Sequence, residues 1–407
     1  MTVLLAAGCG ATSNSTQPAQ TYPAQHSQTP RPVTSATTRA TVTTPATAAT
    51  PGSTCAPGAI GPESASFISP ADGWLLGVTM QDCWPSNSAR IVLRKTTDGG
   101  RHWTPIAAPP APWAGLPYGD SSAKSVGEVY FADARDGWAF APGLWATHDG
   151  GATWRRVDTG GRSVYSLAAT NGHVIAAFLN CGSEACGRSS APSFSIETSP
   201  AGEDAWRPVP GGAGLGLPVV TAAGGTAYAL GAAGAAPKGP GPNDFRTPAM
   251  LLSGSADGTA PWHRRATPCV FGAAYTVTAV TANSLLMACG LLGGHPTTNH
   301  LYRSADSGAH WRQFAYVGLY DGADAVAATP DGKLFVDGIV SGLEVSRDGG
   351  RNWLRPATLA DPPSQVGDGG LIEFAMTTNN DGYLVARYGP LWLTGDGGLT
   401  WSPVTVR

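Results

Sequence analysis

The sequence is poor in charge, since only 13% of its 407 residues are Asp, Glu, Lys or Arg and the formal net charge is −3. A nucleic-acid-binding protein carries a basic patch or stripe, and none is present in this sequence, so we expect no nucleic-acid partner. The CxxC pairs of a zinc site are missing, and the eight histidines show no ligand spacing. GxSxG, P-loop and dinucleotide-binding motifs are missing too. The sequence therefore predicts no metal, no cofactor and no catalytic residues.

Glycine and proline, in contrast, are abundant, with 54 and 34 residues. This is too much turn-forming chemistry for a helical protein, and it suits many short strands joined by tight turns. All-β barrels and propellers often fold a chain of this length as one unit. The composition thus favours an all-β fold.

The N-terminus reads Met1-Thr-Val-Leu-Leu-Ala-Ala-Gly-Cys9, a short apolar run that ends in a cysteine. It resembles the lipobox of bacterial lipoproteins, which implies that the Cys9 thiol carries a lipid. A cationic segment is missing, and the run is shorter than the roughly 7–15 residues of a signal peptide, so we expect the start codon to lie upstream. The resemblance implies a lipoprotein on the outer face of the plasma membrane, or alternatively a secreted protein.

The six other cysteines are an even number, which fits three disulfides in an oxidising compartment. Six cysteines can pair in fifteen ways, so the sequence leaves the connectivity open. Proximity along the chain favours Cys55–Cys83, Cys181–Cys186 and Cys269–Cys289.

Residues 10–58 consist mainly of Thr, Ser, Ala, Pro and Gln, with almost no large apolar side chains. Such a segment cannot bury enough apolar surface to fold, and as a flexible coil it would span on the order of 40 Å. We therefore divide the chain into a signal remnant with the lipobox at 1–9, a linker at 10–58 and a folded domain at 59–407.

The folded domain repeats the motif Ser/Thr-x-Asp-x-Gly-x-x-Trp. Clean copies begin at Thr96, Thr147, Ser304, Ser346 and Thr394, whereas the copies that begin at Thr198 and Ser255 are degraded. The third positions, 98, 149, 200, 257, 306, 348 and 396, are 42 to 57 residues apart, which is the length of a propeller blade. The motif residues to which we assign a structural role are Asp98, Trp103, Asp149, Trp154, Asp257, Trp262, Asp306, Trp311, Asp348, Trp353, Asp396 and Trp401.

Each residue type in the motif has a physical reason. The Asp carboxylate accepts hydrogen bonds from backbone amides a few residues on, which closes a turn. The Gly allows a left-handed backbone conformation that a Cβ would penalise. The Trp begins the next strand and covers the apolar edge of the blade. The motif therefore predicts a hairpin turn between two strands.

The motif resembles the Asp-box (BNR) repeat of sialidases, sortilin-type receptors and photosystem II assembly-factor-like propellers. Asp72-Gly73-Trp74, Asp136-Gly137-Trp138 and Asp381-Gly382-Tyr383 stand upstream of several boxes, and this combination looks most like the assembly-factor subgroup. The resemblance implies a β-propeller and a non-enzymatic protein.

Four apolar stretches fill each period, for example Ile91–Thr96 in the first and Leu391–Thr394 in the last. We therefore predict a seven-bladed β-propeller of four-stranded antiparallel blades, with strands a to d running outward from the axis and little strand exchange at the ring closure. The a–b turns and the Asp boxes are expected on one face. The other face would carry the long loops, which are Met80–Ala89, Leu179–Pro192, Ala232–Pro248, Ala108–Ser125, Tyr316–Ala323 and Thr358–Gly370.

The long-loop face is where we expect binding, because function concentrates on loops that a scaffold positions. Aromatic and charged residues there would suit a protein, peptide or glycan. The candidates are Trp84, Trp113, Tyr118, Asp120, Arg188, Asp244, Arg246, Tyr316, Tyr320, Asp321, Asp324 and Asp361.

We interpret the chain as a monomeric, surface-anchored, non-catalytic propeller that binds a protein, peptide or glycan and assists assembly of an envelope complex. The alternatives are a carbohydrate-binding module and an exo-acting glycosidase. A sialidase resemblance requires three arginines, a nucleophilic Tyr and its Glu partner, and Arg387 is the main arginine on the inner strands. Another glycosidase needs two carboxylates about a cleft, and the candidates near the axis are Glu128, Asp324, Asp337 and Glu373.

Overall fold

The computed structural model describes residues 60–81, 84–85, 89–115, 124–180, 193–233, 248–270, 273–291, 297–319, 323–338, 342–356, 359, 371–386 and 390–406. The chain divides into two compact units, Met1–Ser53 and Thr54–Arg407, and all described residues belong to the second. Cys9, the 10–58 linker and the predicted pairs Cys55–Cys83 and Cys181–Cys186 lie outside the described residues. Within the described residues, no helix is long and apolar enough to span a membrane.

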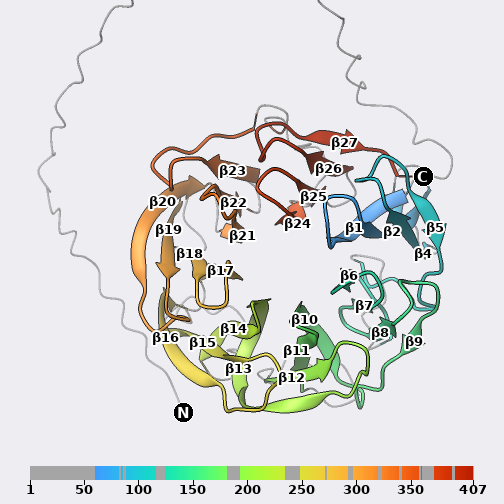
Figure 1. The fold of residues 1–407 in the computed structure, drawn as a ribbon, viewed down its shortest axis with the longest axis horizontal. Helices are drawn as coiled ribbons and strands as arrows, with labels where there is room; N and C mark the ends of the chain where they lie inside the picture. Colours follow the sequence, from blue (N-terminus) through green and yellow to red (C-terminus); the bar gives the residue numbers. More distant parts are fainter. Residues whose placement is uncertain are drawn as a thin grey trace, which may run out of the picture. The chain divides into compact units, whose positions relative to one another are not determined.

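The strands of the second unit form a β-propeller, as the repeat predicts (Figure 1). The second strand of each blade shows why the sequence folds this way. His173–Leu179 and Gly382–Ala386 are apolar without alternation and buried almost throughout, because a strand that is covered on both faces must be apolar on both. The first strand of each blade lies nearest the axis of the ring and the last lies at its rim (Figure 1).

The first two blades are separate sheets. Blade 1 contains β1 (Ile60–Phe67), β2 (Gly73–Gln81), β4 (Ile91–Thr96) and β5 (Thr104–Ile106), and the short β3 (Trp84–Pro85) pairs with β2. Blade 2 contains β6 (Glu128–Phe131), β7 (Gly137–Phe140), β8 (Leu144–Thr147) and β9 (Arg155–Arg156).

The next two blades share one strand and form a single seven-stranded sheet. Its strands are β10 (Ser163–Thr170), β11 (His173–Leu179), β12 (Phe194–Pro200), β13 (Arg207–Ala223), β14 (Thr226–Ala233), β15 (Pro248–Ser255) and β16 (His263–Val270). The first part of β13 pairs with β12 up to Leu215, and the part from Leu215 onward pairs with β14. We divide β13 at Leu215 and assign its two parts to blades 3 and 4 for reference.

The last three blades are again separate sheets. Blade 5 contains β17 (Ala273–Ala279), β18 (Leu285–Leu291), β19 (Thr297–Ser304) and β20 (Arg312–Leu319). Blade 6 contains β21 (Ala323–Ala328), β22 (Leu334–Gly338) and β23 (Gly342–Ser346). Blade 7 contains β24 (Leu371–Met376), β25 (Gly382–Ala386), β26 (Leu391–Thr394) and β27 (Ser402–Val404). The fourth strand expected in blade 6 is reduced to a single bridge between Val345 and Leu354.

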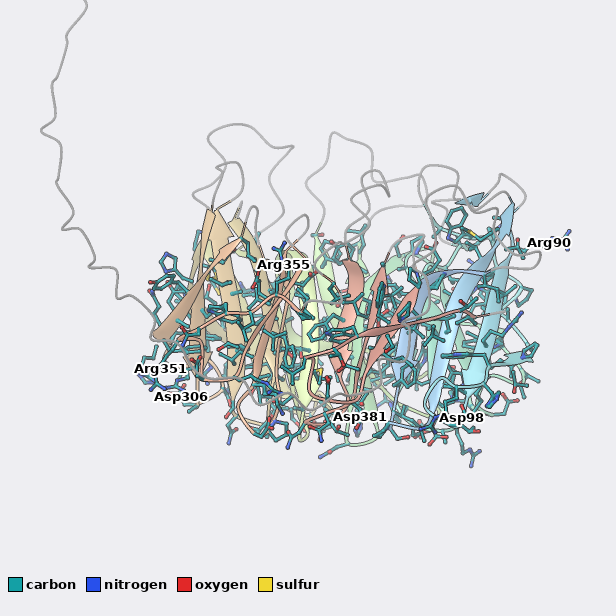
Figure 2. The ribbon with its side chains drawn as sticks, turned by 90° about the horizontal axis from the view of Figure 1, so that it is seen from above. Arg90, Asp98, Asp306, Arg351, Arg355 and Asp381 are labelled. Carbon is teal, nitrogen blue, oxygen red and sulfur yellow. A yellow bond between two sulfur atoms is a disulfide. The ribbon has the colours of Figure 1, made fainter. Side chains whose placement is uncertain are left out.

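The a–b turns and the Asp boxes lie on one face, which we call the Asp-box face. Gly99 N donates to Ala71 O and Gly150 N to Arg135 O, so each box is hydrogen-bonded to the a–b turn of its own blade. Asp98 and Asp306 of the boxes and Asp381 of an a–b turn lie along the same edge of the ring (Figure 2). The opposite face, where the innermost strands begin, is the long-loop face.

The box of blade 1 shows the internal bonding of the motif. Thr96 Oγ1 donates to Asp98 Oδ1 at 2.9 Å and accepts the Gly100 N–H at 2.9 Å, and Asp98 Oδ1 accepts the His102 N–H at 2.9 Å. The hydrogen bonds from the His102 backbone and side chain lower the pKa of Asp98 to about 2. The boxes that begin at Thr147, Ser304, Ser346 and Thr394 repeat this pattern.

In the segment of blade 3 that corresponds to the degraded box, Asp204 contacts residues of blade 2. The Asp204 carboxylate lies 3.1 Å from His148 Nε2 and 2.7 Å from Arg155 Nη2, and it accepts the Trp138 Nε1–H at 3.1 Å. His148 Nδ1 also lies 2.7 Å from Asp136. His148, which occupies a variable box position, therefore bridges two blades.

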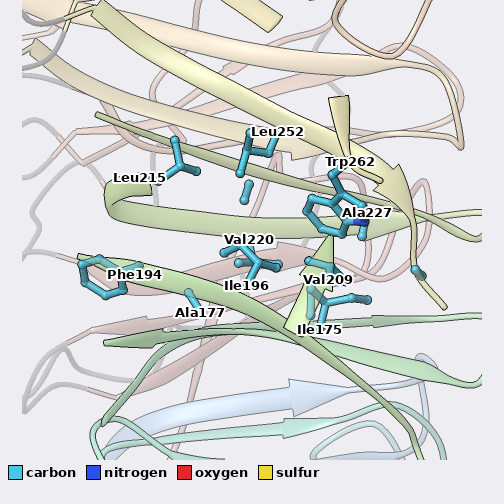
Figure 3. Packing of buried hydrophobic residues seen from close by; sticks show 13 residues of the cluster. Ile175, Ala177, Phe194, Ile196, Val209, Leu215, Val220, Ala227, Leu252 and Trp262 are labelled. Carbon is cyan, nitrogen blue, oxygen red and sulfur yellow. The ribbon is translucent and has the colours of Figure 1, made fainter. Parts of the chain in front are cut away.

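Apolar side chains fill the spaces between blades. Between blades 3 and 4, Ile175, Phe194 and Val209 pack against Val220 and Trp262, all of them buried (Figure 3). Burial contributes about 25 cal/mol per Å² of apolar surface, so these layers are the main source of stability.

Side chains of one blade also accept backbone N–H groups of the next. Ser66 Oγ accepts from Phe131 N at 2.9 Å, Ser166 Oγ from Val220 N at 3.0 Å, and Thr221 Oγ1 from Ala279 N at 3.0 Å. These bonds occupy donors of innermost strands, which lack a strand partner on the axis side.

The predicted Cys269–Cys289 disulfide is present and joins β16 to β18. Both cysteines are buried, with exposed fractions of 2% and 8%. The bond therefore ties the outermost strand of blade 4 to the second strand of blade 5.

We expect reduction of this disulfide to lower the free energy of unfolding by roughly 3 kcal/mol, because a bridge over 20 residues restricts the unfolded chain. Urea unfolding with and without dithiothreitol measures the effect. The control is the Cys269→Ala/Cys289→Ala variant, whose stability should be insensitive to dithiothreitol at this bridge. Equal losses in the wild type and the control would contradict the prediction.

Candidate binding site at the axis

The innermost strands are irregular where they leave the long-loop face. The pairing register shifts between Pro62 and Ser64, between Val164 and Ser166, between Ala323 and Ala325, and between Leu371 and Glu373. Each shift is a β-bulge, which adds one residue and re-aims its side chain. The added residues are Glu63, Tyr165, Asp324 and Ile372.

Tyr165 is the most exposed aromatic residue of these strands. It is 45% exposed, and its ring packs edge-on against Phe194 at a centroid distance of 5.4 Å. The adjacent innermost strand, β6, begins with Glu128, whose side chain is exposed. The long-loop end of the axis therefore presents an aromatic side chain on one blade and a carboxyl on the next.

A second carboxyl, Glu373 of β24, closes the ring between blades 7 and 1. Its Oε2 accepts hydrogen bonds from Ser64 Oγ at 2.8 Å and Ala65 N at 2.9 Å. Its Oε1 accepts the Tyr383 hydroxyl at 3.1 Å. Between blades 7 and 1, Glu373 thus accepts the backbone N–H that a Ser or Thr hydroxyl accepts between the other blades described above.

Both carboxyls have raised pKa values. Desolvation, followed by the charge of Glu373, raises the pKa of Glu128 to about 8. Desolvation raises the pKa of Glu373 to about 7 despite the three hydrogen bonds that it accepts. Glu128 is solvent-accessible by its surface area, yet enough protein surrounds it to weaken its hydration and raise its pKa.

A glycosidase uses one protonated carboxyl as acid and one ionised carboxylate as base or nucleophile. At pH 7 Glu128 favours the protonated form, and Glu373 is roughly half ionised. Tyr383 and Glu373 form a Tyr–Glu pair, but desolvation raises the pKa of Tyr383 well above 10, and the side chain is 6% exposed. Arg155, Arg162 and Arg355 form ion pairs with Asp204, Glu197 and Glu344, which lie outside this cluster.

Two other acidic candidates do not complete a site. Asp337 is buried in β22, the second strand of its blade, and therefore does not lie on an innermost strand. Asp324 lies at the bulge of β21. Within the described residues, no group of three or more His, Cys, Asp or Glu side chains could hold a metal ion.

The predicted binding residues do not gather in one described place. Trp113 is only 5% exposed and pairs with Val126, so its assignment as an exposed contact residue is wrong. Tyr316 is 67% exposed, but it belongs to the outermost strand β20 and not to a loop. Trp84 lies in β3. Tyr118, Asp120, Arg188, Asp244, Arg246, Tyr320, Asp321, Asp361 and Arg387 lie outside the described residues.

Sequence reasoning missed Tyr165 altogether. It lies within an eight-residue strand, Ser163–Thr170, that looks like any inner strand. A β-bulge has no signature in one sequence, because it depends on how the strand pairs. Glu128 and Glu373 were singled out as carboxylates near the axis, and the structure brings their charges together.

No protein-family model and no curated protein matches the chain. Among solved structures, it is similar to YCF48 bound to D1 peptide, with a TM-score of 0.50 and 15% identity over 84% of this chain and 94% of the other. YCF48 from Cyanidioschyzon merolae gives a TM-score of 0.51 and 15% identity over 84% and 97% of the chains. Pyrococcus horikoshii acylaminoacyl peptidase gives 0.50 and 11% over 86% and 52%. At these identities the likeness establishes the β-propeller fold alone.

The raised pKa values predict how stability depends on pH. Between the unfolded value near 4.5 and the folded values of about 7 and 8, the folded state binds more protons than the unfolded state, so stability falls as pH rises. Between pH 5 and pH 8.5, the melting temperature of the Glu128→Gln variant should therefore decrease by less than that of the wild type. The same decrease in melting temperature for the wild type and the variant would contradict the raised pKa of Glu128. The control is the Glu344→Gln variant.

Proposed function

We propose that the chain is a non-catalytic propeller that binds a peptide segment of a protein partner at the long-loop end of its axis. The observation that carries the proposal is Tyr165, an aromatic side chain that is 45% exposed on a bulged innermost strand. Exposed Tyr residues are frequent anchors of protein interfaces. A bulge changes the direction of a side chain relative to a regular strand, and the exposed part of the Tyr165 ring is accessible to a partner.

The carboxyl of Glu128, on the adjacent innermost strand β6, favours a segment with a donor group. Glu128 has no hydrogen-bond partner or ion pair within the described residues, and near pH 7 it favours the protonated form. An ammonium or guanidinium group from a ligand would restore its charge, because an opposite charge lowers the pKa of a carboxyl. A peptide with Lys or Arg beside an apolar side chain therefore matches both residues.

The comparisons support the kind of partner. A solved propeller with a similar fold is described as bound to a peptide.

Anchoring remains part of the proposal. We propose that Cys9 carries a lipid and that residues 10–58 space the monomeric propeller from the outer face of a membrane. The Cys9→Ala variant, expressed in a bacterium from its full coding region, should move from the membrane fraction to the soluble fraction. Retention of the variant in the membrane would contradict the lipid anchor and leave the axial site unaffected.

The axial site is tested by selecting peptides from a displayed random library on the full chain. Peptides that bind the wild type should lose at least about tenfold in affinity on Tyr165→Ala, and on Glu128→Gln if they carry Lys or Arg. The control is Tyr316→Ala, which removes an exposed tyrosine from the rim. Binding that survives Tyr165→Ala, or that Tyr316→Ala weakens equally, would refute the axial site.

A further inference from the structure

A cavity of about 550 Å³ opens between blades 5 and 6 on the Asp-box face. We call it the blade 5/6 cavity. Leu286, Trp311 and Phe314 line it from blade 5, and Ala328, Leu334 and Gly349 line it from blade 6. The volume lies within the range of small-molecule sites, and a mostly apolar wall with a few polar groups is typical of them.

The cavity exists because blade 6 departs from its neighbours. A Cβ built on Gly99 or Gly150 would meet a carbonyl of the a–b turn at 2.9 or 2.7 Å, whereas one on Gly349 would meet nothing within 4 Å. Gly332, in the a–b turn of blade 6, is equally open. The Asp box and the a–b turn therefore lie further apart in this blade than in blades 1 and 2.

Two arginines stand at the cavity without a counter-charge. Arg303 of β19 lies directly opposite Arg312 of β20 on one side and Leu286 of β18 on the other. Residues directly opposite each other in neighbouring strands share a face of the sheet, so all three face blade 6. Neither guanidinium has an ion pair within the described residues. Like charges directly opposite each other destabilise a sheet. An anion bound between them would remove that repulsion.

The acidic residue that lines the cavity, Asp306, is bonded within its own Asp box. Asp306 Oδ2 lies 2.6 Å from His310 Nδ1, and Asp306 Oδ1 accepts the His310 N–H at 2.9 Å and the Ser304 hydroxyl at 2.8 Å. These bonds lower the pKa of Asp306 far below its usual range. Its charge is thus used within the Asp box.

Aromatic groups favour a flat ligand. A register shift between Leu301 and Tyr302 makes Phe314 the bulged residue of β20, and the Arg303 guanidinium lies 5.1 Å from the centroid of its ring. The Trp311 Nε1–H is buried without an acceptor, whereas Trp154 and Trp353 donate to carbonyls of the preceding blade. Trp206 is the other box tryptophan without an acceptor, and it packs edge-on against Phe178 at 5.2 Å.

We propose that the blade 5/6 cavity binds a small aromatic carboxylate. Its ring would lie against Phe314 and Leu334, and its carboxylate between Arg303 and Arg312. Guanidinium groups pair well with carboxylates and also stack on aromatic faces. This site lies on the face opposite the axial site and does not depend on it.

The test uses 2-naphthoate and its neutral amide, 2-naphthamide, titrated into the full chain by calorimetry. We expect 2-naphthoate to bind one to one and 2-naphthamide to bind at least tenfold more weakly. Arg303→Gln and Arg312→Gln should each weaken 2-naphthoate at least about tenfold, and Ala328→Phe, which fills the cavity, should abolish binding. Arg101→Gln alters an arginine of the blade 1 Asp box and should change nothing.

Absence of binding by the wild type at millimolar 2-naphthoate would overturn the proposal. So would equal affinity for the amide, or affinity that neither arginine variant changes. Because Arg303 and Arg312 are exposed, their variants should retain the wild-type melting temperature, and they keep the test decisive even if Ala328→Phe fails to fold.

Discussion

The innermost strand of each blade has one edge that faces the axis and no strand to pair with there. The backbone donors of that strand must nevertheless find acceptors, because an unpaired buried N–H is costly. Ser66, Ser166 and Thr221 provide these acceptors from the preceding blade. These bonds set the stacking of one blade on the next, and the apolar layers between blades follow from that stacking.

At the closure of the ring, the acceptor is a carboxyl. Glu373 receives Ala65 N, Ser64 Oγ and the Tyr383 hydroxyl. A group with two oxygens can serve three donors where a hydroxyl serves fewer. The cost is desolvation, which raises the pKa of Glu373 and, together with the charge of Glu373, that of Glu128. The same constraint thus closes the fold and leaves a weakly acidic group at the axis.

Features made within a few residues of chain were predictable. The Asp-box bonds join residues two to four apart, so the spacing of Thr96, Asp98 and Gly100 predicts both the turn and the period. β4 and β26 have the expected bounds, Ile91–Thr96 and Leu391–Thr394. The Cys269–Cys289 pair also follows from proximity in the chain.

Features that depend on how separate segments pair or meet in space were not predictable. The exposure of Tyr165 depends on a bulge, the burial of Trp113 on a bridge to Val126, and the Asp204–His148 contact on two blades meeting. None of these three contacts can be predicted from residues that are close together in the sequence. The candidate site could therefore be identified only in the structure, whereas the sequence repeat predicted most of the architecture.

The continuity of β13 has a mechanical consequence. The single strand β13 carries 17 residues from the rim of blade 3 to the inner strand of blade 4, and it is paired with β12 and then with β14. Separation of blades 3 and 4 would therefore have to disrupt this continuous strand near Leu215. In a fold whose repeats mainly contact their neighbours, blades 3 and 4 are therefore expected to unfold together as one cooperative block.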